Sequence, residues 1–408
     1  MKSRPRIAAL VSIYHRYAHA QHIVDRFLEG YGWNGKHHRP EMDVVSLYVD
    51  QINSPPAEPE EGKQYDLSQD RVDRFPNLNR YPTIADALTC GTETLAVDGV
   101  LIIAEHGEYN VNEKGQTLWP RYEFFKQMLS VFCVSGKSVP VFNDKHLSWN
   151  WDWAKEMYDA SVELDFPFMA GSSLPVTWRT PSVELPLQSK VNEAMCVGCG
   201  WSDGGDLHGF ETIQGMVERR KGGETGVRWI EAFRGERFWK ALSEEQWSRS
   251  LFDACLSRGH ELTPARAGFN NIFPTMDEMK HLVSDPWAYQ YEHNDGLVCT
   301  MIAMNGLFGG SWAFSADIEG KDDPISTYMY LPMPPGQTTL ANFFSPQVNN
   351  IEKMFLTGEA SYPIERTLLT TGLTIAGVES IHNNQSRIQT PHLSISYQPN
   401  PKSTYWHT

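Results

Sequence analysis

Three adjacent ionisable residues, Asp144, Lys145 and His146, lie a little beyond the first third of the chain. They follow the apolar, β-prone residues Val139 to Phe142 and precede Trp151 to Asp165, a stretch of helical composition with its charges mostly on one side. This order predicts that the triplet lies at the carboxyl end of a buried strand, where open α/β sheets bind their ligands. Three ionisable groups at that place indicate a catalytic or ligand-binding site. The alternative is a surface loop whose charges are solvated.

The first third of the chain alternates between strand-like and helix-like segments. The predicted strands are Ile7 to Ser12, Val44 to Asp50, Gly99 to Ala104 and Val139 to Phe142, and the predicted helices are Ala18 to Gly30, Ile84 to Thr89 and Tyr122 to Ser135. Such alternation predicts a doubly wound parallel sheet with helices on both faces. We therefore expect a first domain over residues 1–175.

The pattern changes after Pro175. Further strands are predicted at Glu193 to Gly200, Leu297 to Met304 and Trp312 to Asp317, and helices at His208 to Arg220, Trp229 to Leu242, Asn349 to Gly358 and Thr367 to Ser380. Asn-Asp-Gly and Gly-Gly turn signals between the later strands favour antiparallel pairing. Residues 176–408 are therefore expected to form an α+β domain with an open, largely antiparallel sheet.

The composition is that of a globular protein with ample core. The chain has 408 residues, of which 41% are hydrophobic, and a formal net charge of −15. An acidic chain of this kind argues against binding to nucleic acid or to anionic membranes and favours a small-molecule ligand. The absence of a long apolar run or a signal-peptide pattern predicts cytoplasmic residence. Cys196 and Cys199 are expected to be buried thiols.

Several segments resemble the Gfo/Idh/MocA family of glucose-fructose oxidoreductases and inositol dehydrogenases. Residues 81–88 and 97–104 resemble the third-strand region of that family, and Val139 to Ser148 is similar to its strand ending in Glu-Lys-Pro. Tyr291 to Gly296 resembles a segment of the family's second-domain sheet, and Gly358-Glu359 with Pro363 to Arg366 resembles its C-terminal helix region. The resemblance implies a Rossmann-like first domain and a second domain for substrate and subunit contacts, and hence a homo-oligomer.

The resemblance also implies roles for three residues. Lys145 matches the lysine that contacts both nicotinamide cofactor and substrate in the family. Asp206 and His208 are similar to its Asp-x-x-x-His pair, with a shortened spacing, and His208 is expected to open a helix and to act as the general acid or base. A helix cap at His208 and a turn at Asp206 are the structural alternative.

The loop after the first strand departs from the dinucleotide-binding pattern. That pattern places G-x-G-x-x-G there, whereas Ser12-Ile13-Tyr14-His15-Arg16-Tyr17-Ala18-His19 contains no glycine. Three basic side chains of the loop, His15, Arg16 and His19, could still hold an anion near the helix N-terminus. Asp50 ends the second strand, where a ribose-binding acid belongs. The expected residues for NAD or NADP are Ser12, His15, Arg16, Asp50 and Glu105.

A metal site is the alternative for the same strand ends. Carboxylate and imidazole groups suit zinc, manganese or iron(II). The candidate ligands are Glu105, His106, Asp144, His146 and Glu211, with His208 nearby in sequence. A hydrogen-bonded polar cleft without metal is the simpler interpretation.

Three functions follow from these patterns. The first is an oxidoreductase that acts on a secondary hydroxyl of a sugar, polyol or related metabolite, with Lys145 polarising the oxygen and His208 taking the proton. The second is a metal-dependent lyase, isomerase or hydrolase on a carbohydrate-like substrate. The third is a ligand-binding protein without catalytic activity.

Overall fold

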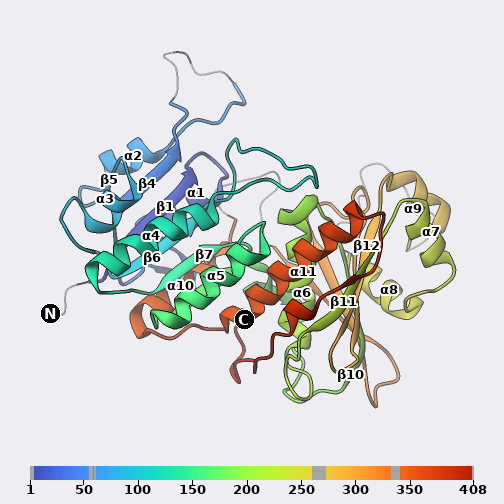
Figure 1. Cartoon of the computed structure of the whole chain (residues 1–408). Helices are drawn as coiled ribbons and strands as arrows, with labels where there is room; N and C mark the ends of the chain where they lie inside the picture. The colour runs from blue at the N-terminus through green and yellow to red at the C-terminus, as the bar shows by residue number, and fades with distance from the viewer. Residues whose placement is uncertain (1–3, 55–57, 59–60, 260–272, 332–340, 407–408) are drawn as a thin grey trace. The chain divides into compact units, whose positions relative to one another are not determined.

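The computed structural model describes residues 4–54, 58, 61–259, 273–331 and 341–406, and the chain forms two compact units (Figure 1). The first unit contains Met1–Asn110, Thr117–Ser173 and Pro332–Ile364, and the second contains Val111–Gln116, Leu174–Leu331 and Glu365–Thr408. A segment from the C-terminal third of the chain thus completes the first unit.

The first unit is built on a six-stranded sheet in which every pairing is parallel. Its strands, in spatial order, are β5 (Asn79–Arg80), β4 (Asp43–Gln51), β1 (Arg6–Ile13), β6 (Gly99–Ile103), β7 (Val141–Asp144) and β8 (Phe168–Gly171). The central strands are almost wholly apolar and buried, as in sheets covered on both faces. The chain runs outward from β1 in one direction and then from β6 in the other. The point between β1 and β6 is therefore a topological switch point, where such sheets bind ligands.

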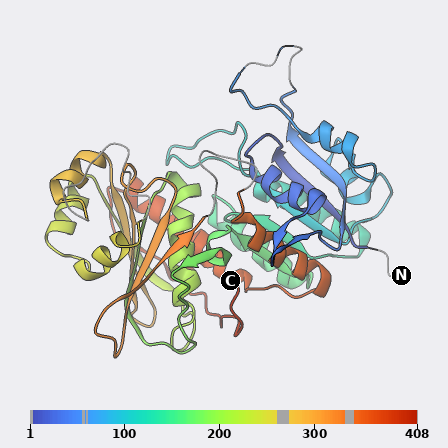
Figure 2. The same ribbon diagram turned by 180° about the vertical axis from the view of Figure 1, so that it is seen from behind.

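Helices cover both faces of this sheet (Figures 1 and 2). On one face α1 (His19–Glu29) packs against α10 (Phe344–Thr357), and on the other α4 (Arg121–Ser135) packs against α3 (Ile84–Thr89) and α5 (Trp151–Glu163). α2 (Ser68–Arg74) lies beside β5, and β2 (Tyr31–Trp33) pairs with β3 (Lys36–His38) in a short hairpin. Residues Asn150 and Thr83 cap α5 and α3 with side-chain oxygens, which fixes where each helix begins.

The second unit is built on an eight-stranded sheet. Its strands, in spatial order, are β16 (Ile388–Gln389), β11 (Val227–Arg234), β12 (Trp287–His293), β13 (Val298–Ala303), β10 (Val191–Gly198), β14 (Trp312–Ile318), β15 (Ile325–Tyr330) and β9 (Trp178–Thr180). All pairings are antiparallel except that between β10 and β13. The predicted fold class, a parallel α/β sheet followed by an α+β region with a largely antiparallel sheet, is confirmed.

Two long helices of the second unit, α6 (Ser202–Val217) and α11 (Ile364–His382), approach its sheet closely through glycines. A Cβ at Gly209 of α6 would lie 2.5 Å from Met301, and one at Gly377 of α11 would lie 3.0 Å from the Tyr289 ring. Since Tyr289 and Met301 are paired in register, the two helices lie on the same face. The remaining helices are α7 (Glu236–Ser243), α8 (Arg249–Leu256) and α9 (Met276–Leu282), with 3-10 turns at Leu174–Val176 and Pro391–Leu393.

Two sequence-based predictions are wrong. Trp229 to Leu242, expected as one helix, is strand β11 followed by α7, because Gly235 with φ 59° separates them. His208, expected to open a helix, lies in the second turn of α6, which already begins at Ser202. The glycines at 204 and 205 do not interrupt that helix.

Cys196 and Cys199 are buried, unpaired thiols, as expected. None of the helices in the described ranges has the length and apolar content needed to cross a membrane.

Candidate functional site

Three loops at the carboxyl ends of the parallel strands carry a non-glycine residue with a left-handed backbone. These residues are Tyr17 after β1, His106 after β6 and Lys145 after β7, with φ values of 69°, 72° and 68°. Such a conformation costs about 1 kcal/mol or more at a residue with a side chain, and it persists only where surrounding contacts impose it. At Lys145 the backbone N–H donates to the carbonyl of Gly171 at 3.1 Å. The strand ends therefore hold their side chains in imposed positions.

Glu105 lies at the centre of the group of side chains at these strand ends. Its carboxylate forms an ion pair with Arg121 and lies 3.7 Å from the Lys145 ammonium nitrogen, and all three side chains are buried. Burial by itself would raise the pKa of Glu105, but the charges of Lys145 and Arg121 outweigh it and hold the pKa well below its usual range. One carboxylate thus faces two buried cations.

Arg121 connects this carboxylate to the predicted triplet. Its Nε donates to the backbone carbonyl of Asp144 at 3.2 Å, and its Nη1 lies 3.3 Å from Nε2 of His146. Because a guanidinium can only donate, His146 accepts through Nε2. The structure therefore brings together Glu105, Asp144, Lys145 and His146.

His19, the first residue of α1, contacts the same group of side chains through Asp144. Its Nδ1 lies 2.6 Å from Oδ2 of Asp144, a carboxylate that is fully buried. Its backbone N–H donates to Nδ1 of His106 at 3.4 Å, and the two imidazole rings meet edge to face at 5.0 Å. Burial and the neighbouring His19 lower the pKa of His106 to about 3, so that His106 is neutral at neutral pH. His19 was expected only as one of three anion-holding side chains, and its pairing with Asp144 has no local sequence signal.

The expected cofactor-binding residues also lie at this end of the sheet. Ser12 is buried, and its hydroxyl is 3.0 Å and 2.9 Å from the carbonyl oxygens of Glu105 and His106, which ties β1 to the loop after β6. Arg16 is exposed, and His15 bonds through Nδ1 to the Arg16 carbonyl at 2.7 Å.

Asp50 lies near the end of β4 and is exposed. Its two carboxylate oxygens accept hydrogen bonds from the hydroxyls of Tyr48 and Tyr109, each at 2.8 Å. Burial and the bond to Asp50 raise the pKa of Tyr48 to about 12. Since a carboxylate can accept about four hydrogen bonds, Asp50 keeps the capacity to bind a further hydroxyl.

Asp206, His208 and Glu211 lie on α6 of the second unit. The carboxyl group of Asp206 accepts from the hydroxyl of Tyr289 at 2.7 Å and from the indole of Trp287 at 3.2 Å, and burial raises its pKa to about 7. Residues two apart on a helix point in different directions, whereas His208 and Glu211, three apart, share a face. The His208 ring lies 4.9 Å from that of Trp312.

The metal alternative gains no support from the described ranges. Within them, no cluster of three or more His, Cys, Asp or Glu side chains has an arrangement that could hold a metal ion. Of the expected ligands, Glu105 already faces two cations, which would repel a third, and Glu211 belongs to the other unit.

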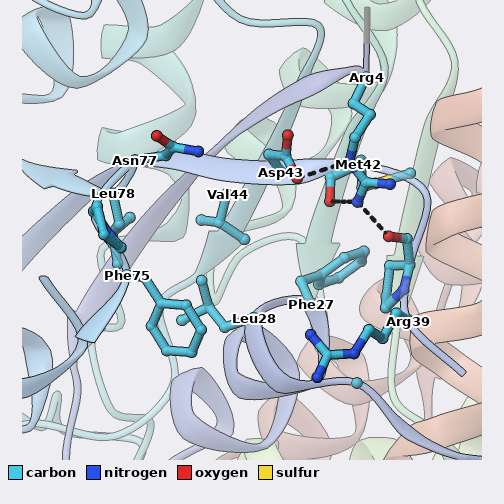
Figure 3. A pocket seen from close by; sticks show the side chains of 13 residues that line it. Arg4, Phe27, Leu28, Arg39, Met42, Asp43, Val44, Phe75, Asn77 and Leu78 are labelled. Atoms are coloured by element: carbon cyan, nitrogen blue, oxygen red, sulfur yellow. Dashed lines mark hydrogen bonds and ion pairs between the residues drawn. The ribbon is translucent and has the colours of Figure 1, made fainter. Parts of the chain in front are cut away.

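A separate cavity of about 180 Å³ lies at the opposite end of the parallel sheet, near the first residues of β4 (Figure 3). Phe27, Phe75 and Val44 form apolar walls, while Arg4 is held at the rim by Asp43. This end of a parallel sheet is not where ligands of doubly wound folds bind. The candidate site is therefore the cluster around Lys145.

Solved structures with a similar fold have been determined. Myo-inositol dehydrogenase from Lactobacillus casei, in complex with NAD(H) and myo-inositol, superposes with a TM-score of 0.53 at 10% identity over 95% of this chain and 97% of that one. GenD2 from gentamicin A biosynthesis, in complex with NAD, gives 0.57 at 11% identity over the same shares. A Gfo/Idh/MocA family oxidoreductase from Vibrio cholerae gives 0.50 at 12% identity over 93% and 99%.

The chain has the fold of the Gfo/Idh/MocA oxidoreductases. The resemblance in its sequence is thus confirmed at the level of the fold, over nearly the whole chain. No protein-family model matches the sequence, and no curated protein matches it either.

Replacing Glu105 by glutamine should destabilise the protein by about 3–5 kcal/mol, because two buried cations lose their counter-charge. Urea unfolding followed by circular dichroism measures this change. The control is Glu156→Gln, which removes an exposed pair with Lys126 and should cost less than about 1 kcal/mol. Equal effects of the two variants would contradict the central role given to Glu105.

Asp206 should make the protein less stable as the pH rises. Its pKa in the fold, about 7, exceeds the usual 3.8, so its contribution is complete below pH 4 and is lost as the pH rises through 7. Between pH 4.5 and pH 8 the wild type should lose about 3 kcal/mol more unfolding free energy than Asp206→Asn, at 1.36 kcal/mol per pKa unit. The control Asp253→Asn, at a partly exposed residue, should retain the wild-type pH dependence.

Proposed function

We propose that this chain is a nicotinamide-dependent oxidoreductase that oxidises a secondary hydroxyl of a sugar, a polyol or a related small metabolite. The observation that carries the proposal is the Lys145 ammonium, held by Glu105 at the carboxyl end of β7, next to the switch point of a doubly wound sheet. The fold shared with NAD-bound inositol dehydrogenases supports the same reaction class.

The residues at this end of the sheet fit a dinucleotide whose phosphates are bound by side chains. The first turn of α1 contains no acidic residue, and the exposed Arg16 precedes it. Both features favour an anion near the N-terminus of α1, even though no glycine lets the backbone approach closely. Asp50 keeps acceptor capacity for a ribose hydroxyl. NAD and NADP both fit this description.

In the proposed reaction the nicotinamide supplies a hydride acceptor. Lys145 donates a hydrogen bond to the reacting oxygen and stabilises the negative charge that develops there. Glu105 fixes the ammonium, and Arg121 fixes Glu105, so the donor does not have to reorganise during the reaction. His208 is the proposed acid/base by resemblance to the family.

Lys145→Ala should reduce turnover by at least about 100-fold, because the reacting oxygen loses its charged donor. The protein should stay folded, since Glu105 retains its pair with Arg121. Steady-state assays with NAD and NADP against a panel of inositols, hexoses and acyclic polyols provide the measurement. Lys155→Ala, which removes an exposed pair with Asp159, is the control and should keep full activity. Near-normal turnover in Lys145→Ala would refute the assigned role.

Arg16→Ala should weaken binding of NAD or NADP by about tenfold or more, the loss expected for one charge-assisted hydrogen bond to a phosphate. The dissociation constant can be measured by calorimetry at two salt concentrations, and the wild type should show the steeper salt dependence. The control is Arg39→Ala at the opposite end of the sheet (Figure 3). A wild-type protein that binds neither nucleotide would refute the proposed function itself.

A further inference from the structure

Five histidines of the described residues lie near the strand ends of the first unit, and they differ in what their rings can do. His15 is partly exposed, and its Nδ1 bonds to the backbone carbonyl of Arg16 and not to a carboxylate. His146 is fully buried against Arg121, and His22 is also buried, whereas His106 is half-buried. Desolvation is the chief cause that lowers the pKa values of His22 and His106 to about 3. The His19 side chain is 17% exposed and contacts a carboxylate. It is therefore the histidine in this group best able to exchange a proton with a bound molecule.

Asp144 sets the orientation of the His19 ring. The short bond from Nδ1 to Oδ2 of Asp144 requires the proton on Nδ1, which leaves the lone pair on Nε2. Within the described ranges, Nε2 makes no hydrogen bond, and the other Asp144 oxygen has no hydrogen-bond partner either. The carboxylate thus acts mainly on His19, and the ring presents a free acceptor nitrogen.

The ring is also fixed by packing. His106 contacts it edge to face at 5.0 Å and 82°, and Phe344 of α10 contacts it at 5.0 Å and 78°. The carboxylate, the imidazole and the two packing rings all belong to the first unit. A base held by a carboxylate in a set tautomer is the arrangement that enzymes use for proton transfer.

The His19–Asp144 pair lies next to Lys145, the residue that binds the substrate oxygen in the proposed reaction. Asp144 directly precedes Lys145, and Glu105, which binds the Lys145 ammonium, also feels the charge of His19. A substrate hydroxyl bound by Lys145 would therefore lie close to the His19–Asp144 pair of the same unit.

We propose that His19, positioned by Asp144, is a proton-transfer residue of this site. When a secondary alcohol is oxidised, its O–H bond breaks and the proton passes to Nε2 of His19. The C–H bond breaks as its hydride reduces the oxidised nicotinamide, and the C=O bond forms. The imidazolium that results is stabilised by Asp144, and in the reverse direction it returns the proton. This role rests on the proposed function, and in it His19 takes the proton that the resemblance to the family would give to His208.

The first test is His19→Gln, which retains a hydrogen-bond donor for Asp144 but cannot accept a proton. The value of kcat should fall by about 100-fold or more, as for loss of a general base, while the dissociation constant for the nicotinamide nucleotide stays within about threefold. Added imidazole should restore part of the activity of a His19→Ala variant. Unchanged turnover in His19→Gln would overturn the proposal, as would loss of nucleotide binding in step with turnover, which would make His19 a cofactor ligand.

The chain offers a matched control in His38, which pairs through Nε2 with Glu352 at 2.7 Å and is also partly exposed. His38→Gln removes the same kind of pair away from the strand ends and should leave kcat unchanged. An equal loss in His38→Gln would show that the effect is structural and would also overturn the proposal.

A second readout does not need turnover. In ¹⁵N NMR spectra of the imidazole side chains, neutral His19 should carry its proton on Nδ1, and Asp144→Asn should lower the fraction of that tautomer. A His19 protonated on Nε2 in the wild type would contradict the proposed orientation. A wild type with the expected tautomer but no nucleotide binding would instead locate the failure in the proposed function.

Discussion

The site depends on one buried carboxylate, that of Glu105, which attracts two buried cations. Arg121 is the first residue of α4, where the helix dipole disfavours a positive charge, so its position there is explained by Glu105 and not by the helix. The guanidinium also reaches the backbone of Asp144, and the carboxylate holds Lys145. The loop after β6, the start of α4 and the end of β7 are thereby joined by charge, and removal of Glu105 takes a buried counter-charge away from both cations.

The parallel sheet determines where that charge cluster lies. Outward winding from β1 and from β6 creates the switch point, and the loops after β1, β6 and β7 all end beside it. Each of the three loops contains a residue with positive φ that is not glycine, so the contacts of the cluster compensate the backbone strain. In the proposed function, the glycine-free first loop leaves phosphate recognition to side chains instead of backbone amides. The positions of these side chains therefore matter more here than in proteins with the glycine-rich pattern.

Local sequence patterns predicted the parts of this arrangement that local physics controls. The alternation of apolar strands with helices gave the parallel sheet, and the triplet at 144–146 lies at a strand end as expected. Pairings between distant residues could not be predicted in this way. His19 and Asp144 are separated by 125 positions and meet only because α1 and β7 end at the same edge of the sheet. In Trp229 to Leu242, aromatic residues suit a buried strand as well as a buried helix, and Gly235 decided between them.

Two imidazole-carboxylate pairs in the first unit show that the position of such a pair in the fold determines its role. The pairs are His19 with Asp144, whose atoms lie 2.6 Å apart, and His38 with Glu352, whose atoms lie 2.7 Å apart. In both, the carboxylate is buried and the histidine is partly exposed. Glu352 also accepts from the backbone N–H of Glu41, so this pair fastens the segment after the β2–β3 hairpin to α10. Asp144 has no such second partner within the described ranges, and it directly precedes the buried lysine. The Glu352–His38 pair therefore stabilises the fold, whereas the Asp144–His19 pair leaves an oriented imidazole nitrogen at the strand ends, where the proposed function places the ligand.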